Sequence, residues 1–532
     1  MKTERKVPRR HADRWRVAAG ALSGLLAGCA ALAVAELLSA AVRPESGPVV
    51  AVGGAAIDRT PAAVKDWAIQ RFGTDDKLVL QAGILAVLAL LAIALGLLAL
   101  RHRRAGSAGV LLFGAIGAVA ATTRPDSTGL VDAVPSLVGS VAGAALLYVL
   151  MGRLVPRAAA ATPDGAGGEG WDRRGFLIAA SAAAAASAGA GVLGKSLNAA
   201  SGKDAVASRA GVALPAPASA ASPAPRTAQL RVPGISSFVT PNKDFYRVDT
   251  ALVVPKVNAW TWRLRIHGKG VGRARTLSFA DLLRRDLIER DITLTCVSNE
   301  VGGPYVGNAR WIGVPLAELL EESGVVPPSR GGPADQLVAR SVDGMTIGTP
   351  VEDVMDGRDA LLAVGMNGEP LPFEHGFPVR MLVPGLYGYV SACKWIRDIE
   401  LTTFDDYDPY WVQRDWARKA PVKTQSRIDT PKPFARPKAG TVMVAGVAWA
   451  QHRGIDKVEV RVDDGPWRPA DLAAEDTRDT WRQWSFRWKA TPGGHTLTVR
   501  ATDRTGTVQT EQRTRTIPDG ASGWHSVVVT VD

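Results

Sequence analysis

The feature that most constrains this chain is a set of five long apolar segments within its first two hundred residues. A helix needs about 20 consecutive apolar residues to cross a bilayer. The sequence therefore predicts an α-helical membrane anchor of five spans over residues 1–200. The segments run from about 17 to 41, 78 to 100, 107 to 122, 134 to 152 and 176 to 194.

Charged residues beside these segments predict their orientation. Residues 1–16 hold seven Lys or Arg and two acidic residues, and the basic run 101–104 joins the second and third segments. Basic connections stay in the cytoplasm, whereas connections 43–77 and 123–133 are balanced or acidic, as exported ones usually are. We therefore expect a multi-pass protein of the cell membrane, with the chain beyond residue 195 outside the cytoplasm.

The same flanking charges explain the net charge of +12. A nucleic-acid-binding surface would gather basic residues into one stripe with interleaved aromatic side chains, and this chain has no such stripe. Within the first span, Glu36 is a candidate polar contact, and placement at the membrane interface is the more ordinary explanation for it.

The sequence WDRRGFLIAA, which starts at Trp171, precedes the fifth segment. It resembles a twin-arginine export signal, with Arg173 and Arg174 before a weakly hydrophobic run, although it lies inside the chain. Two ordinary cytoplasmic arginines before a span would give the same pattern. The Ala-rich run would insert poorly without help, which favours the export signal.

Composition divides the rest of the chain. Residues 201–229 form an Ala/Pro-rich linker that cannot build a core of its own, so ordered structure is expected near Leu230. Residues 230–434 mix strand and helix patterns in an α+β domain. Residues 435–532 show short strands at regular spacing with Asp-Asp-Gly and Pro-Gly-Gly turns, which predicts an all-β, immunoglobulin-like sandwich.

Three cysteines, Cys29, Cys296 and Cys393, are too few and too widely spaced for a disulfide framework, a zinc ribbon or an iron-sulfur cluster. Cys296 stands at the end of a predicted strand, before a polar Gly-rich loop. A free cysteine is usually a small buried hydrophobe. A position at a strand end favours an accessible thiolate, a soft ligand that suits a transition metal.

The segment around this cysteine, TLTCVSNEVGG, resembles the molybdenum-binding motif of sulfite oxidases and plant-type nitrate reductases. The stretches TPNKDFYRVDT from Thr240, NARWIGVPLAELL from Asn308 and MNGEPLPFEHGFPVRMLVPGLYGYVSACKWIRDIEL from Met366 resemble further segments of the sulfite oxidase superfamily, as does the C-terminal sandwich. The resemblance covers roughly residues 235–532.

This resemblance implies a molybdopterin-dependent oxidoreductase that moves an oxygen atom in a two-electron reaction at one molybdenum per chain. Cys296 would be the catalytic residue and the protein ligand to the metal. The cofactor needs donors for a phosphate and mixed hydrogen-bonding groups for a pterin ring. The implied cofactor-binding residues are Asn242, Phe245, Tyr246, Asp343, His375, Arg380, Ser391 and Lys394.

The sequence departs from this family on the substrate side. Sulfite oxidases carry basic residues just after the motif, where this chain has Glu300 and Val301, and a tyrosine where it has Ile347. A carboxylate would repel sulfite. Exported methionine-sulfoxide reductases of the superfamily also lack the basic pair, so reduction of a neutral S-oxide or N-oxide remains an alternative.

The positions of the histidines indicate that the chain needs a separate redox partner. The seven histidines lie outside the predicted spans, so the helices cannot hold a bis-His haem, and electrons must pass to a separate redox partner, a cytochrome or a quinone. Relatives often pair through the sandwich, which makes a homodimer an expectation. A membrane-bound scaffold that keeps the fold without catalysis is the competing hypothesis. Retention of Cys296 argues against it, because a scaffold needs no metal thiolate.

Overall fold

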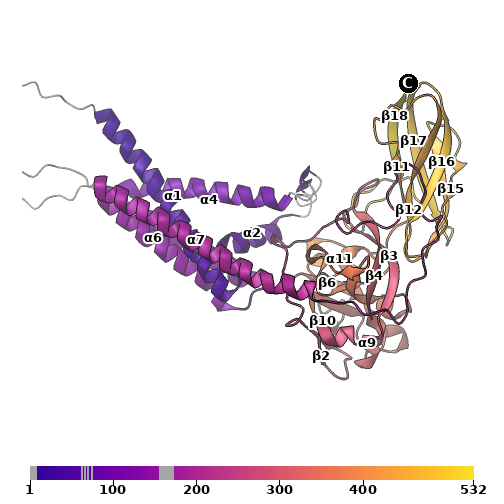
Figure 1. Cartoon of the computed structure of the whole chain (residues 1–532), viewed down its shortest axis with the longest axis horizontal. Coiled ribbons are helices and arrows are strands. Elements are labelled where there is room, and N and C mark those ends of the chain that lie inside the picture. Colours follow the sequence, from indigo (N-terminus) through magenta and orange to yellow (C-terminus); the bar gives the residue numbers. More distant parts are fainter. Residues whose placement is uncertain (1–8, 62–63, 65–66, 69–70, 73–75, 155–172) are drawn as a thin grey trace, which may run out of the picture. The chain divides into compact units, whose positions relative to one another are not determined.

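The computed structural model describes residues 9–61, 64, 67–68, 71–72, 76–154 and 173–532. It divides into two compact units (Figure 1). The first lies within residues 1–204 and includes 250–253; the second comprises residues 205–249 and 254–532.

The first unit is helical, as the sequence predicts. In the part of the chain that is described, five helices are long and apolar enough to cross a membrane, and each overlaps one of the five predicted segments. The helices of this unit are α1 (Arg9–Val42), α2 (Pro48–Arg59), α4 (Asp76–Arg101), α5 (Arg103–Thr123), α6 (Val134–Leu154) and α7 (Arg173–Ala210), whose last six residues belong to the second unit. Trp171 and Asp172 of the twin-arginine-like sequence lie outside the described residues.

Small residues allow these helices to pack closely. A Cβ added at Gly24 of α1 would lie 2.0 Å from the carbonyl oxygen of Ala92 in α4, so the two backbones touch where side chains are absent. Polar groups also join helices. The side chain of Asn198 in α7 donates a 2.7 Å hydrogen bond to Oε1 of Glu36 in α1, so Glu36 does make a polar contact.

The predicted linker, residues 201–229, differs in the structure. Residues 201–210 are the last part of α7, and residues 211–228 form no helix or regular strand but pack within the second unit. Val212 and Ala228 are buried in its core, because small apolar side chains can fill grooves that a larger element has already formed. The Ser219 carbonyl accepts a 2.8 Å hydrogen bond from the Glu289 amide. Ordered structure therefore begins before Leu230.

The α+β part of the second unit contains two sheets around one hydrophobic core. The first sheet has the order β2-β1-β10-β5-β6, and the second has the order β3-β4-β7-β8, with β9 pairing to β7. Their strands are β1 (Arg263–Gly268), β2 (Arg275–Ser278), β3 (Ile288–Thr295), β4 (Val306–Pro315), β5 (Gln336–Ser341), β6 (Thr346–Pro350), β7 (Leu361–Met366), β8 (Glu369–Pro370), β9 (Arg380–Leu382) and β10 (Ile396–Thr402).

Short helices cover these sheets: α8 (Phe279–Leu283), α9 (Leu316–Glu322), α10 (Val351–Met355) and α11 (Gly388–Ser391). A capping box begins α8, where Ser278 and Asp281 bond to each other's backbone amides. The helix α9 ends just before Gly324, which takes a positive φ of 84°.

The C-terminal part contains two four-stranded sheets, β11-β12-β16-β15 and β14-β13-β17-β18, which share a second hydrophobic core. Figure 1 shows these strands packed together near the C-terminus. Because β11 pairs with β12, this part begins at Gln425, before the expected boundary at residue 435. The strands are β11 (Gln425–Thr430), β12 (Gly440–Trp449), β13 (Ile455–Val462), β14 (Arg468–Pro469), β15 (Asp471–Leu472), β16 (Arg482–Ala490), β17 (Gly493–Asp503) and β18 (His525–Val531).

Candidate active site

Cys296 directly follows β3 and opens a tight loop that leads into β4. Its amide donates a 2.9 Å hydrogen bond to the Tyr305 carbonyl, and its own carbonyl accepts one of 3.0 Å from the Asn299 amide. The Asn299 side-chain oxygen accepts from the Tyr305 amide at 2.7 Å. These bonds fix the backbone on both sides of the cysteine, whose side chain is partly exposed rather than packed in the core.

Aromatic side chains lie beside this loop. Phe245 stacks on Tyr246 with ring centroids 5.2 Å apart and meets the His375 ring edge-on at 5.5 Å. Burial raises the pKa of the Tyr246 phenol, and the negative charge of Cys296 raises it further. The segment that carries Phe245 and Tyr246 therefore comes next to the cysteine, as the resemblance implies.

Two basic side chains are buried in the same region. His375 Nε2 lies 3.0 Å from the Asn242 carbonyl, and burial together with the nearby Arg380 charge lowers the pKa of His375 to about 4. Arg380 is 6% exposed, and its Nη1 donates to the His375 carbonyl at 3.4 Å. Its buried Nε has no hydrogen-bond partner among the described residues. A buried guanidinium with a spare donor fits an anionic ligand.

A second group of charges lies close to Arg380. Lys394 Nζ and Asp249 Oδ2 are 2.6 Å apart, and Arg247 Nε donates to the same oxygen at 2.9 Å. Burial raises the pKa of the Asp343 carboxyl, Asp249 raises it further, and Lys394 opposes this. The predicted residues Asp343, Arg380 and Lys394 are therefore electrostatically linked.

Two predicted residues have side chains engaged elsewhere. Asn242 donates a 2.6 Å hydrogen bond to Glu369 and accepts one of 2.8 Å from Asn367. Ser391 is fully buried, and its hydroxyl bonds at 3.0 Å to the carbonyls of Leu386 and Tyr387. Asn242 still touches the group through its carbonyl, whereas none of these hydrogen bonds directs the Ser391 hydroxyl toward Arg380 or Cys296.

The C-terminal sheets also hold the Cys296 loop. Arg427 in β11 donates a 2.8 Å hydrogen bond from Nη1 to the Gly303 carbonyl, and its Nε pairs with Asp429 at 2.7 Å. The His525 ring lies against Gly302, where an added Cβ would be 2.3 Å from Nε2. The loop is thus held by side chains from strands that lie far away in the sequence.

Sequence reasoning missed four of these residues: Arg247, Asp249, Arg427 and His525. A signal existed for the first two, because they alternate in the segment that also carries Phe245 and Tyr246. No local pattern distinguishes Arg427 or His525 from other polar residues on strands. Their contacts to the loop depend on how the C-terminal sheets pack against the α+β part.

The buried histidines predict a pH dependence of stability. His375 and His525 both have a pKa lowered to about 4, against an ordinary value of about 6.5. The unfolded chain then binds more protons, so their stabilising contribution is complete above about pH 6.5 and is lost as the pH falls toward 4. For His375 this amounts to on the order of 3 kcal/mol.

We expect His375→Gln, whose amide can still donate to the Asn242 carbonyl, to weaken this acid-induced loss. Thermal unfolding of the detergent-solubilised chain at pH 7, 5.5 and 4.5 measures it. His495→Gln is the control, because Asp463 raises the pKa of His495 and reverses the sign of its contribution. An unchanged pH profile for His375→Gln would contradict the assignment.

Arg427→Ala should loosen the Cys296 loop, because it removes a charged donor from the Gly303 carbonyl and leaves the Asp429 carboxylate without its nearest cation. Such a bond contributes about 1.5–3 kcal/mol, so amide exchange over residues 299–303 should accelerate by about 10-fold or more. Hydrogen-exchange mass spectrometry measures this. Arg436→Ala, which breaks an exposed pair with Asp532, should leave the loop unchanged; equal effects of the two variants would overturn the prediction.

Known proteins resemble the part of the chain that carries this site. Residues 251–411 match the family model described as the oxidoreductase molybdopterin binding domain. Rat mitochondrial sulfite oxidase is 29% identical over 296 residues, which cover 47% of this chain and 53% of that protein. Chicken sulfite oxidase is 32% identical over 296 residues, 48% of this chain and 63% of that protein.

The chain thus spans about half the length of the rat enzyme. An uncharacterized oxidoreductase of Bacillus subtilis (strain 168), YuiH, is 33% identical over 155 residues, which cover 29% of this chain and 72% of YuiH. The match therefore extends over most of YuiH, and the match to the family model includes the cysteine loop described above. The chain belongs to the sulfite oxidase superfamily of molybdopterin-binding oxidoreductases.

Proposed function

We propose that this chain is a membrane-anchored enzyme that transfers an oxygen atom in a two-electron reaction at one molybdenum, with Cys296 as the protein ligand. The observation that carries the proposal is the position of Cys296. Its thiol is partly exposed, in a loop fixed by Tyr305 and Asn299, and it lies close enough to Tyr246 to raise the pKa of that phenol. A structural cysteine would be packed in the core, as Cys393 is.

The surrounding side chains suit molybdopterin, a pterin that carries a dithiolene and a phosphate. Arg380, with its unpartnered Nε, and Lys394 would hold the anionic phosphate, because one is a buried cation and the other a partly buried cation in the same cluster. His375 is neutral at pH 7 and can donate or accept toward the pterin. Phe245, Tyr246, Asn242 and Asp343 would line the ring. Ser391 would support α11 rather than bind through its hydroxyl.

When bound, the molybdenum cofactor supplies the two-electron redox chemistry. The chain contributes orientation and electrostatics. The hydrogen bonds around Cys296 fix its backbone, and the cations of Arg380 and Lys394 would compensate negative charge brought in by the cofactor. The neutral His375 keeps a donor available without adding a further positive charge beside Arg380.

Residues on the substrate side favour a neutral S-oxide or N-oxide over sulfite. Glu300 is exposed, four residues after Cys296 in the same loop, and its carboxylate would repel an anion. Ile347, which stands where sulfite oxidases have a tyrosine, is buried in the hydrophobic core. Reduction of such an oxide is the second candidate reaction for the same site.

We also propose that the five apolar helices anchor the chain in the cell membrane and that the catalytic part lies outside the cytoplasm. The basic connection Arg101–Arg104 and the basic N-terminus support this orientation. Arg173 and Arg174 would then act as an internal twin-arginine signal. The proposed domains are a helical anchor that ends with α7, a molybdopterin domain that includes residues 211–228 and runs to residue 424, and an immunoglobulin-like domain from Gln425, which would supply the surface for a homodimer. A cytochrome or quinone would exchange the electrons.

Cys296→Ser should lower the molybdenum content from about one per chain to well below half, and activity toward sulfoxides, N-oxides or sulfite with an artificial redox dye should be lost. The reason is that serine offers no soft thiolate to the metal. Elemental analysis of purified protein measures this, and Cys393→Ser, at a buried cysteine, is the control. Full turnover in the Cys296 variant would disprove the mechanism.

Replacing Arg173 and Arg174 together by Lys should block export of a reporter fused after Leu230, because a twin-arginine signal requires both guanidinium groups. A double Lys replacement at Arg103 and Arg104 keeps positive charge at another basic connection and should not affect export. If the Arg173 and Arg174 variant showed unchanged reporter activity outside the cytoplasm, the twin-arginine proposal would be wrong. Ordinary charge-directed insertion would then explain the topology.

A further inference from the structure

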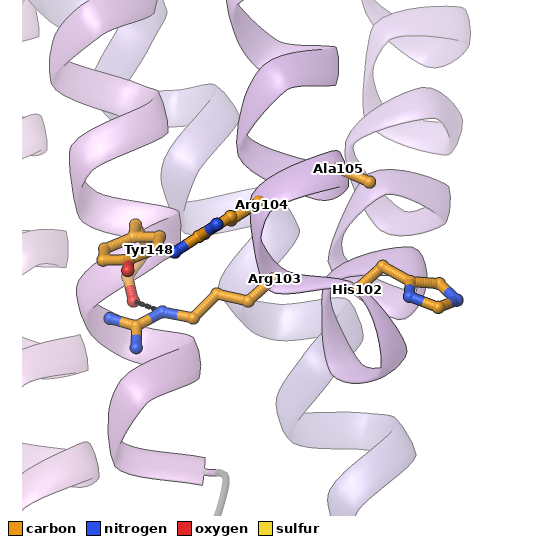
Figure 2. A pocket seen from close by; sticks show the side chains of 5 residues that line it. All are labelled: His102, Arg103, Arg104, Ala105 and Tyr148. Atoms are coloured by element: carbon orange, nitrogen blue, oxygen red, sulfur yellow. Dashed lines mark hydrogen bonds between the residues drawn. The ribbon is translucent and has the colours of Figure 1, made fainter.

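The turn between α4 and α5 forms a basic hollow, which we define by its lining residues His102, Arg103, Arg104, Ala105 and Tyr148. Its volume is about 470 Å³. In Figure 2 the side chains of Arg103 and Arg104 both extend toward Tyr148 on α6, whereas His102 points to the opposite side of the turn. The hollow therefore presents two guanidinium groups beside one aromatic ring.

Arg103 is held in a fixed orientation within this hollow. Its Nε donates a 2.6 Å hydrogen bond to the Tyr148 carbonyl, and its guanidinium carbon lies 3.4 Å from the centre of the Tyr148 ring. Gly152 on α6 makes room for it, because an added Cβ would lie 2.7 Å from Nη2. A guanidinium held in this way is ready to bind an oxyanion without losing further side-chain freedom.

No carboxylate among the described residues forms an ion pair with Arg101, Arg103 or Arg104. Three positive charges thus lie within four residues, and no acidic side chain among the described residues neutralises them. Charge-directed insertion explains why such residues stand between two spans. It does not explain why Arg103 is braced against the next helix, beside a hollow that can hold a ligand.

The hollow also lies at the end of apolar helices. Arg101 is the last residue of one candidate span, and Arg103 is the first residue of the next. In a membrane, such a turn lies at the level of the lipid phosphates, and the cytoplasmic leaflet is rich in anionic lipids. The exposed ring of Tyr148 suits the same interface, because one face of it can remain among acyl chains.

We propose that this hollow binds the headgroup of an anionic phospholipid, with Arg103 and Arg104 contacting its phosphate. The occupant is a lipid rather than free phosphate, because the site opens where two membrane spans meet. This inference rests on the membrane placement proposed above and is independent of the molybdenum chemistry. It adds a specific lipid-binding site to the anchor.

The test uses the purified full chain in detergent, with phosphatidylglycerol or phosphatidylcholine added and bound lipid counted by native mass spectrometry. The wild-type chain should retain phosphatidylglycerol at least 10-fold more tightly than phosphatidylcholine. Arg103→Gln with Arg104→Gln should reduce that preference by about 10-fold or more, because each surface arginine contributes about 1 kcal/mol toward an anionic lipid. Arg104→Gln alone, at an exposed side chain, should reduce it by several-fold without disturbing the Arg103 brace.

Arg59→Gln is the matched control. Arg59 is an exposed arginine on α2 that bonds to the Ala55 carbonyl of its own helix, so its replacement removes the same charge from a different place. Equal retention of the two lipids by the wild-type chain, or an unchanged preference in the double variant, would overturn the proposal. So would complete displacement of phosphatidylglycerol by millimolar inorganic phosphate, which would indicate a site for a soluble anion. Molybdenum content measured on the same samples separates this outcome from failure of the proposed enzyme.

Discussion

The position of one thiol depends on a short loop that is fixed at both ends. Cys296 follows the last residue of β3. Its amide donates a hydrogen bond to the Tyr305 carbonyl, and its carbonyl accepts one from the Asn299 amide. Beyond it, Gly303 is held by Arg427 from the C-terminal sheets. A metal ligand must keep its direction when the metal arrives, and a loop that is bonded on each side meets this requirement. The C-terminal part therefore contributes to the site although none of the proposed cofactor-binding residues belongs to it.

Charge is the second constraint on the site. Arg380 is buried and Lys394 is partly buried, and burying cations costs free energy unless they are paired. Asp249 pairs with Lys394, whereas Arg380 keeps an unpartnered Nε and has a carbonyl as its hydrogen-bond acceptor. Burial accordingly lowers the pKa of Arg380. An anion bound there would stabilise the site, so a phosphate-bearing cofactor would complete the fold as well as the reaction.

Local patterns were sufficient for much of this structure. The apolar segments, the strand before Cys296 and the regular C-terminal strands all depend on neighbouring residues, and the structure contains each of them. The order of elements could therefore be predicted. No local pattern predicts that Phe245 and His375 belong to one site; only the family resemblance implies it. In the structure the rings of Phe245 and His375 are in contact.

Other features depend on packing between distant segments, and the sequence carried no local signal for them. Val212 and Ala228 appeared to belong to a free linker, yet they fill grooves of a core built by later strands. Ser391 appeared suited to bind a cofactor, but its hydroxyl caps carbonyls of Leu386 and Tyr387. The contacts that Arg427 and His525 make with the Cys296 loop depend on the packing of β11 and β18 against that loop.

The central claim is that Cys296 bonds to molybdenum, and X-ray absorption at the molybdenum edge of the purified protein tests it most directly. The account predicts three sulfur neighbours in the wild-type chain, two from the cofactor dithiolene and one from Cys296. In any Cys296→Ser protein that retains metal, it predicts two. The same sulfur count in both proteins would contradict the account.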